Sequence, residues 1–212
     1  LMQILFSSET DPALNAAIEE QLFRASPLQP TLLFYRNTPA VLLGRNQNPW
    51  QECNLRWCRN NGVSILRRLS GGGTVFHDLG NLNYAFIIAR DDYDQQRYLR
   101  CIISALQAVG IDGARICDHF SIWVGNHKVA GSAFALSGRA ALLHGCILVK
   151  TDLEQLRLAL HQDPRDHFTA TTVASVRVPV KNLSEINRAL SCASVRDAIC
   201  RAAQSLGSEG SI

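Results

Sequence analysis

The sequence lacks the patterns that mark several large functional classes. It has no internal repeat and no low-complexity tract, which argues against solenoid and disordered proteins. Its first residues, Leu1–Phe6, have no basic flank and are followed by Ser-Ser-Glu, so we expect neither a signal peptide nor a membrane span there. Charged residues make up only 18% and the net charge is +3, too mild a balance to indicate a nucleic-acid partner.

The cysteines lack any metal-binding or disulfide pattern. There are seven, an odd number, and no pair has the spacing of a zinc site. We therefore assign no metal-ligating residue and expect reduced, mostly buried thiols. Such thiols indicate a cytosol-like compartment: the cytoplasm, or the mitochondrial matrix if the source is eukaryotic.

A Gly-x-Gly-x-x-Gly motif does not follow the first strand-like run, which disfavours a doubly wound nucleotide-binding fold. Strand-like runs come in clusters broken by separate helices, which predicts an α+β fold with a mixed or antiparallel sheet and flanking helices. With 212 residues, 47% of them hydrophobic, we expect a single domain over residues 1–212. The expected strands are Gln3–Phe6, Thr31–Tyr35, Ala40–Gly44, Ser64–Arg67, Val75–Phe76, Asn83–Ala89, Ala114–Ile116, Ile122–Val124, Lys128–Phe134 and Ala140–Val149. The expected helices are Pro12–Phe23, a helix ending near Asn61, Asp91–Val109, Asp152–Leu160 and Ser194–Leu206.

The first helix has clear end signals and an apolar stripe. Asp11 is a good N-cap and Pro12 suits the first helical position. Leu14, Ile18 and Leu22 recur at helical spacing, so we predict that they form the buried face. Near the other end of the chain, residues 173–180 alternate and predict a loop or an edge strand.

A glycine-rich loop organises the chain: Arg67-Arg68-Leu69-Ser70-Gly71-Gly72-Gly73-Thr74-Val75-Phe76-His77. Three adjacent glycines let a ligand approach the backbone, and their N–H groups can point at phosphate or carboxylate oxygens. The two arginines can supply forked donors to the same anion. The alternative is a flexible turn with solvated arginines, but strand-like runs on both sides favour a shaped loop.

Lys128 is the second candidate, because it follows a Gly125-Asn126 hairpin signal and begins a strand of small side chains. Its ammonium could bridge a carboxylate and a phosphate, unless it is simply a strand-end lysine facing solvent. His77 and His144 could contact a ligand or be core histidines with satisfied hydrogen bonds.

Cys117 and Cys146 are possible nucleophiles, although buried free cysteines explain them equally simply. No Ser-His-Asp set can be assembled from spacing alone.

Several motifs, in order from about Leu32 to Leu183, resemble the lipoate–protein ligase family, in the branch that includes lipoyltransferases. The glycine loop continues to Asn81 as in the signature loop of that family. The other matching motifs are Gly44-Arg45-Asn46-Gln47-Asn48-Pro49-Trp50-Gln51-Glu52-Cys53-Asn54, His127-Lys128-Val129-Ala130-Gly131-Ser132-Ala133, His144-Gly145 and Ser175-Val176-Arg177 through Lys181-Asn182-Leu183.

The resemblance implies the α+β catalytic domain shared by biotin and lipoate protein ligases, and a reaction in two steps. The carboxylate of lipoate, or of octanoate, attacks the α-phosphate of ATP and gives an acyl-adenylate and pyrophosphate. A lysine of a lipoyl domain or an H-type carrier protein then attacks the adenylate. Mg²⁺ is expected to bridge the phosphates.

The resemblance also implies roles for individual residues. Lys128 would be the catalytic lysine, between the carboxylate and the α-phosphate. The residues implied in ATP and adenylate binding are Arg68, Gly73, Thr74, Val75, Phe76, Lys128 and Arg177. The residues implied in lipoate binding are Arg67, Ser70, Gly71, Gly72, His77, Lys128, Gly131 and His144.

Departures from the family pattern leave alternatives open. The family often has an Asn-Asp pair before the motif lysine, where this chain has His119-Phe120-Ser121-Ile122. Many full-length ligases carry a small C-terminal domain, for which this chain, ending at Ile212, has no room. The chain would then need a separate accessory subunit, or would only transfer a preformed lipoyl-adenylate.

Two other activities are weighed against ligation. One is octanoyl or lipoyl transfer between carrier proteins through a Cys117 thioester, without ATP. The other is a ligand-binding module that has lost the chemistry, which retention of Lys128 and both arginines disfavours. Biotin ligation is disfavoured because a Gly-Arg-Gly-Arg-x-Gly-Arg loop is missing.

Overall fold

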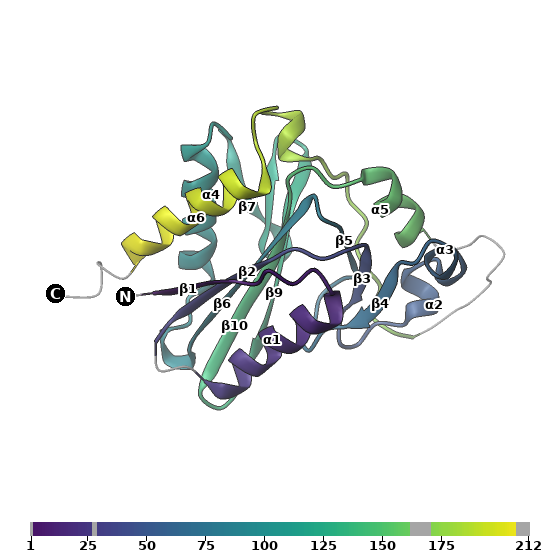
Figure 1. The fold of residues 1–212 in the computed structure, drawn as a ribbon, viewed down its shortest axis with the longest axis horizontal. Helices are drawn as coiled ribbons and strands as arrows, with labels where there is room; N and C mark the ends of the chain where they lie inside the picture. The colour runs from purple at the N-terminus through teal and green to yellow at the C-terminus, as the bar shows by residue number, and fades with distance from the viewer. Residues whose placement is uncertain (1, 27–28, 162–170, 207–212) are drawn as a thin grey trace.

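The computed structural model describes residues 2–26, 29–161 and 171–206 (Figure 1). Its strands are β1 Gln3–Phe6, β2 Thr31–Tyr35, β3 Ala40–Leu43, β4 Ser64–Arg67, β5 Val75–His77, β6 Asn81–Ala89, β7 Ala114–Cys117, β8 Ser121–Val124, β9 His127–Leu136 and β10 Ala140–Leu148. Its helices are α1 Pro12–Ala25, α2 Pro49–Glu52, α3 Leu55–Asn60, α4 Gln95–Ala108, α5 Leu153–Leu160 and α6 Cys192–Leu206, with 3-10 turns η1 Arg90–Asp92, η2 Asp118–Phe120 and η3 Leu183–Glu185.

A seven-stranded mixed sheet forms the centre of the fold, in the order β1-β2-β6-β10-β9-β8-β7. Strands β1 and β2 run parallel and the other neighbours run antiparallel. Alternate residues of β2 enter different cores: Leu32 and Phe34 pack with α4 and α6, whereas Leu33 and Tyr35 pack with α1. Helices therefore cover both faces of the sheet (Figure 1), and the predicted α+β fold with a mixed sheet is confirmed.

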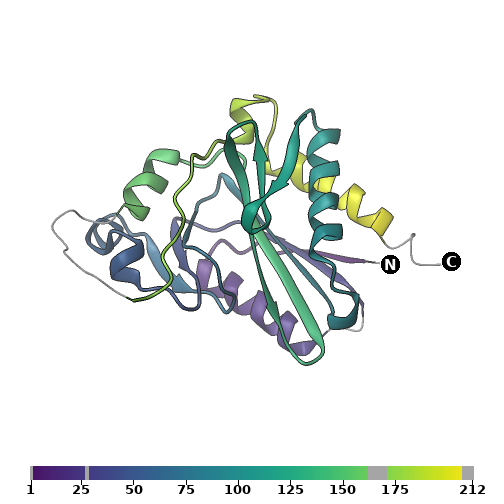
Figure 2. The same cartoon turned by 180° about the vertical axis from the view of Figure 1, so that it is seen from behind.

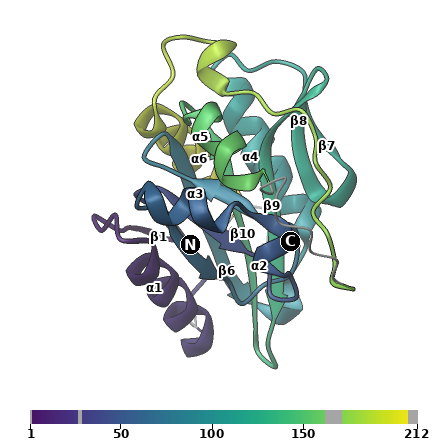
Figure 3. The same cartoon turned by 90° about the vertical axis from the view of Figure 1, so that its right-hand side faces the viewer.

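A second sheet of three strands, in the order β4-β3-β5, stands beside the first. Its core contains Val41 and Phe76, with Cys53 and Cys58 from the α2–α3 region and Ala159 from α5. Figure 3 shows α2, α3 and α5 gathered around this small sheet, at the end of the molecule nearest the viewer. The glycine loop joins β4 to β5, so this sheet fixes both ends of the loop.

Residues 171–182, which we call the strap, have almost no regular structure. One parallel bridge joins Lys128 to Val180, with hydrogen bonds from the Lys128 N–H to the Pro179 carbonyl at 2.9 Å and from the Lys181 N–H to the Lys128 carbonyl at 3.1 Å. Figure 2 shows the strap running between the helices of the small sheet and the strands of the large one. The predicted loop at residues 173–180 is therefore hydrogen-bonded at its end to β9, the strand that carries Lys128.

Two sequence-based predictions need correction. The helix expected at Asp91–Val109 begins at Gln95, because the Asp94 side chain caps it by accepting from the Arg97 N–H, and η1 precedes it. In α1, Ile18 and Leu22 pack against the core, but Leu14 is 45% exposed. The fully buried line of α1 includes polar Asn15 and Glu19, which have hydrogen-bond partners inside the protein. No helix in the described part of the chain is long and apolar enough to cross a membrane.

Candidate functional site

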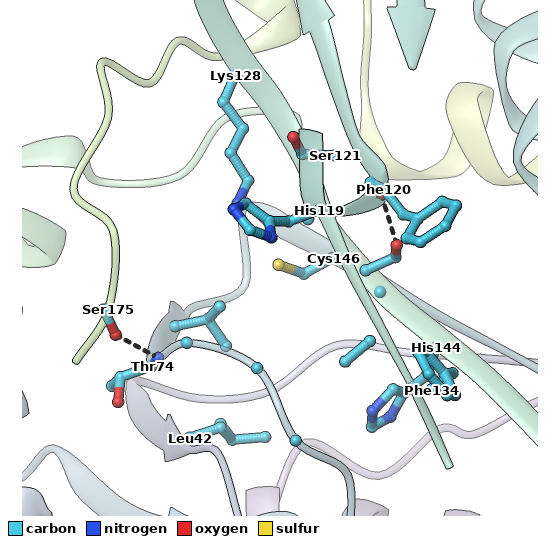
Figure 4. Close-up of a pocket in the computed structure, with 18 of the residues that line it drawn as sticks. Leu42, Thr74, His119, Phe120, Ser121, Lys128, Phe134, His144, Cys146 and Ser175 are labelled. Carbon is cyan, nitrogen blue, oxygen red and sulfur yellow. Dashed lines mark hydrogen bonds between the residues drawn. The ribbon is translucent and has the colours of Figure 1, made fainter. Parts of the chain in front are cut away.

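A cavity of about 1100 Å³ lies between the glycine loop, strands β9 and β10, the η2 turn and the strap (Figure 4). It collects most of the residues that the sequence singled out. Those that line it are Arg68, Gly71, Gly72, Gly73, Thr74, Val75, His77, Lys128, Gly131 and His144. Those that do not are Arg67, Ser70, Phe76 and Arg177.

Lys128 reaches into this cavity across the strand that it begins. A Cβ atom on Gly131 would lie 3.2 Å from both Cε and Nζ of Lys128, so the glycine makes room for the lysine chain. Burial lowers the pKa of Lys128; the Cys146 thiol opposes that shift and the charge on Arg68 adds to it. Lys128 makes no ion pair with any residue that the structure describes. A half-buried ammonium without a counter-ion among the described residues indicates an anionic ligand.

The glycine loop is shaped by Arg68, whose guanidinium donates to the carbonyls of Leu42, Gly71 and Gly73 at 2.7–3.2 Å. Gly72 has a φ of +88°, which favours glycine, and a Cβ there would lie 3.0 Å from Arg68 Nη2. Arg68 therefore brings positive charge to the cavity wall, and its N–H groups hold the glycine loop folded around the guanidinium. The guanidinium of Arg68, which the resemblance implies in phosphate binding, donates to backbone oxygens in the ligand-free chain.

The predicted residues outside the cavity have other positions. The Arg67 guanidinium donates to the carbonyls of Gly44, Arg45 and Gln47, so it holds the preceding polar loop and not a ligand in the cavity. Phe76 is 1% exposed and belongs to the core of the small sheet. Arg177 is exposed on the strap, with Nη1 3.3 Å from Nδ1 of His161.

A buried polar chain that the sequence analysis missed runs beneath the cavity. Ser70 Oγ lies 2.6 Å from His144 Nε2, and His144 Nδ1 lies 2.7 Å from Glu19 Oε1. The Tyr35 hydroxyl donates to Glu19 Oε2 at 3.0 Å, and burial next to this carboxylate raises the pKa of Tyr35. Both nitrogens of His144 are thus occupied, which holds its ring in one orientation at the wall.

His77 is a buried neutral histidine. Asn37 Nδ2 donates to its Nδ1 at 3.1 Å, which requires that nitrogen to be unprotonated. Burial, together with the charges of Arg68 and His144, lowers the pKa of His77 to about 3. His77 therefore contributes a neutral wall at neutral pH.

We expect this histidine to make the fold sensitive to acid. Its folded pKa lies below the unfolded value of about 6.5, so the unfolded chain binds more protons between these two values. The free energy of unfolding should fall below pH 6.5 by up to about 1.4 kcal/mol per pH unit. Urea titrations from pH 7.5 to 4.5 should show this slope in wild type and a shallower one in His77→Gln. Equal slopes in the two proteins would contradict the assignment.

The strap closes over the glycine loop through Ser175. Its Oγ accepts from the Thr74 N–H at 2.8 Å and from Gln47 Nε2 at 2.9 Å, and it donates to Glu52, which also accepts from the Ser175 N–H at 3.1 Å. Gln47 Oε1 in turn accepts from the Thr74 hydroxyl at 2.6 Å. Gln47 thus connects the loop before α2 to the glycine loop, and an anion can reach the Thr74 N–H only after Ser175 moves.

Both candidate cysteines line the cavity, together with the rest of the η2 region. Cys146 is buried beside Lys128, and burial raises the pKa of its thiol, which opposes formation of a nucleophilic thiolate. Cys117 is half-buried at the end of β7. Within residues 2–26, 29–161 and 171–206, no three His, Cys, Asp or Glu side chains are grouped so as to hold a metal ion.

The amino-acid sequence of the chain is similar to those of curated lipoate-protein ligases. Lipoate-protein ligase A from Psychrobacter cryohalolentis is 39% identical over 202 residues, which cover 95% of this chain and 59% of the relative. A relative from Schizosaccharomyces pombe is 38% identical over 182 residues, which cover 85% of this chain and 50% of the relative. The chain therefore spans about half to three-fifths of the length of these curated relatives.

Solved structures resemble it over nearly the whole chain. P. falciparum LipL1 in complex with lipoate has a TM-score of 0.88 and 26% identity, and the match covers 100% of this chain and 65% of that one. A lipoate-protein ligase A bound with ATP has a TM-score of 0.81 and 28% identity, covering 95% and 84%. The ligase of a bi-partite system from Thermoplasma acidophilum, described with its E2 lipoyl domain, has a TM-score of 0.80 and 29% identity, covering 94% and 81%.

The family model confirms what these likenesses and the order of motifs around the cavity indicate. It describes the catalytic domain of lipoyl protein ligases A and B, and it matches residues 11–204. This chain belongs to the lipoyl protein ligase A/B catalytic domain family.

Proposed function

We propose that the chain is an ATP-dependent lipoate–protein ligase, which activates lipoate or octanoate as an acyl-adenylate and transfers the acyl group to a lysine of a carrier protein. One observation carries the proposal: Lys128, which has no ion-pair partner in the described part of the chain, lines the same cavity as the bare backbone of Gly71–Gly73. The lipoate and the ATP in the similar solved structures support these two substrates.

The first step brings two anions together, so the site must offset their repulsion. Lys128 would lie between the acyl carboxylate and the α-phosphate and stabilise the negative charge that develops there. The N–H groups of the loop from Gly73 to Val75 would bind the phosphate oxygens, with Arg68 supplying positive charge behind the loop. Phe76 and Arg177 would act from outside the cavity, by supporting the loop and the strap.

The acyl chain needs a dry, narrow channel, and the other end of the cavity supplies apolar and backbone surface. Gly71, Gly72 and Gly131 leave room there, and the ring of His144 closes the wall. We propose that Ser70 acts only through His144, and that Arg67 acts only by holding the polar loop that precedes the glycine loop. His77 would form part of the neutral wall.

Mg²⁺ would arrive with the nucleotide and not as a resident ion. The described side chains form no group of three potential ligands, and Glu19 of the cavity wall is already bonded to Tyr35 and His144. Mg²⁺ is commonly held by phosphate oxygens and water with only one or two protein carboxylates. When bound, the ion would neutralise phosphate charge.

The acceptor would be the lysine of a lipoyl domain or of an H-type carrier protein. The Thermoplasma system, described with its E2 lipoyl domain, supports the first of these. That system is also described as bi-partite, which supports a separate accessory subunit as a partner of this chain. We further propose that residues 1–212 form one catalytic domain, and that it works in a reducing compartment, the cytoplasm or the mitochondrial matrix, where its seven cysteines stay free.

Replacement of Cys117 by serine separates ligation from thioester transfer. In a ligase the mixed anhydride is already activated, so Cys117→Ser should keep the rate of lipoylation within about threefold of wild type. An acyltransferase that depends on a cysteine thioester would lose its activity. Transfer of octanoate from an acyl-carrier protein, measured without ATP, checks the second activity directly. Dependence of lipoylation on Cys117, without dependence on ATP, would overturn the ligase proposal.

The decisive assay combines the chain, ATP, Mg²⁺, lipoate and a purified lipoyl domain, followed by measurement of the intact mass of the acceptor. We expect the mass increase of one lipoyl group, and no increase when ATP is left out. A second reaction supplies preformed lipoyl-adenylate in place of ATP and lipoate. Product in the second reaction alone would show that the chain only transfers the adenylate, and that adenylation requires a further subunit.

A further inference from the structure

Three histidines line the cavity, and two of them are engaged in hydrogen bonds with neighbouring side chains. His144 is bonded through both nitrogens, to Ser70 and to Glu19. His77 accepts a hydrogen bond from Asn37 and is buried, and its pKa is lowered to about 3. His119 differs from both, since it is exposed at the cavity mouth and its ring makes no hydrogen bond with any described residue.

The His119 imidazole is carried by an unusual backbone turn. His119 has φ 54° and ψ 29°, and Phe120 has φ 55°, so two consecutive residues other than glycine are left-handed. Such conformations persist where the surroundings hold them. Here the Ser121 hydroxyl donates to the Asp118 carbonyl at 2.8 Å, and the Ser132 hydroxyl of β9 donates to the Phe120 carbonyl at 2.6 Å.

The η2 turn directs the His119 side chain into the cavity next to β9, the strand that carries Lys128. η2 packs against β9, and Figure 4 shows the His119 ring pointing into the cavity on the side where the end of Lys128 lies. The acyl-phosphate bond would form beside Lys128. A carrier lysine that enters from solvent must therefore pass the cavity mouth, where His119 stands.

We propose that His119 is the general base of the second step, which takes a proton from the ammonium of the carrier lysine. This inference rests on the proposed function, because it needs an acyl-adenylate in the cavity. An imidazole nitrogen of His119 accepts one proton from the ammonium, and the resulting amine attacks the acyl carbon. The C–N bond forms, the C–O bond to the phosphate breaks and AMP leaves. The second proton of the amine passes to water as the amide forms.

The other titratable groups near His119 suit the task less well. Asp118 on the same turn carries a carboxylate, which is a weaker base than an imidazole. Lys128 on β9 and Arg115 on β7 carry positive charge, which disfavours proton uptake. The thiols of Cys117 and Cys146 also line this region, and the Cys146 pKa is raised. An imidazole is the side chain that most often serves as a general base at neutral pH.

The test supplies preformed lipoyl-adenylate and a purified lipoyl domain to the full chain, and measures single-turnover transfer from pH 6 to pH 9.5. His119→Asn is the informative variant, because asparagine tolerates the left-handed backbone. His127→Asn, the same substitution at a position of β9 outside the cavity lining, is the matched control. Formation of the adenylate is followed separately, by release of pyrophosphate.

At pH 7 we expect His119→Asn to slow transfer by about 100-fold, with pyrophosphate release and His127→Asn both close to wild type. The variant rate should keep rising tenfold per pH unit towards the ordinary lysine pKa of about 10.4, whereas the wild-type rate should rise less steeply, so that the deficit of the variant shrinks as the pH is raised. Added imidazole should restore part of the lost rate.

A His119→Asn protein that transfers at the wild-type rate at pH 7 would overturn the proposal. So would an equal loss at every pH, because a merely structural role predicts that result. The ligase proposal fails on a different observation, the absence of pyrophosphate release by the wild type. Since the transfer assay starts from supplied adenylate, the two failures can be told apart.

Discussion

Replacement of Lys128 by alanine should lower the rate of acyl-adenylate formation by about 10⁴-fold while leaving the protein folded. The expected loss is large because one ammonium serves two reactants. In the proposed reaction it would offset the charge of the carboxylate that attacks and of the phosphate that is attacked, inside a cavity where water screens little. In the ligand-free chain the same ammonium lacks an ion-pair partner among the residues described, so its removal breaks no salt bridge.

Stability and specificity controls accompany this measurement. The melting temperature of Lys128→Ala should stay at or above that of wild type, since the mutation removes a half-buried charge that has no ion-pair partner among the described residues. Lys150→Ala removes an exposed lysine outside the cavity and should leave the rate unchanged. Lys128→Arg keeps the charge but cannot place it above Gly131 in the same way, so it should recover only part of the loss. Normal turnover by Lys128→Ala would show that the proposed role is wrong.

The parts of the structure that local pattern determines were accessible from the sequence. The strands Gln3–Phe6, Thr31–Tyr35 and Ser64–Arg67 have the predicted bounds, because apolar runs between turn residues define them. The joint presence of the glycine loop and Lys128 in one cavity agrees with what the ordered motifs implied. The strand bounds depend on residues that are close together in the chain. The meeting of the glycine loop and Lys128 was predicted from the order of the family motifs.

The parts that long-range contacts determine were not accessible. Glu19 lies on a helix where a charged residue usually indicates a solvent face, and its partner His144 is 125 residues away. Ser175 and Glu52 are separated by 123 residues. Asn15, Glu19 and Phe23 follow one another at intervals of four residues, and they form the buried face of α1. This spacing was the local indication of that face in the sequence. Hydrophobic periodicity alone selects Leu14 instead, because it gives no weight to polar side chains that are satisfied inside the protein.

The second large effect is expected from valine in place of Gly72, which should lower kcat/KM for lipoate by about 10³-fold. The structure gives two reasons. The φ of +88° at Gly72 is costly for a β-branched residue, and a Cβ there would lie 3.0 Å from Arg68 Nη2 and 3.6 Å from the Cβ of Ala133. The valine would therefore narrow the acyl channel towards β9, and it would also displace the guanidinium that holds the loop.

Two further variants separate the steric effect of the valine side chain from the backbone strain at Gly72. One has a smaller side chain at the same position, and the other has valine at a distant glycine. Gly72→Ala introduces most of the backbone strain with less bulk, so lipoate should suffer less from it than from Gly72→Val, whereas the KM for ATP should change similarly in both. Gly138→Val lies in the β9–β10 turn, where a Cβ meets nothing within 4 Å, and should act like wild type. Lipoate binding is measured by calorimetry without ATP. If Gly72→Val binds lipoate as tightly as wild type and stays folded, the acyl chain does not lie against the glycine loop, and the channel must be sought elsewhere in the cavity.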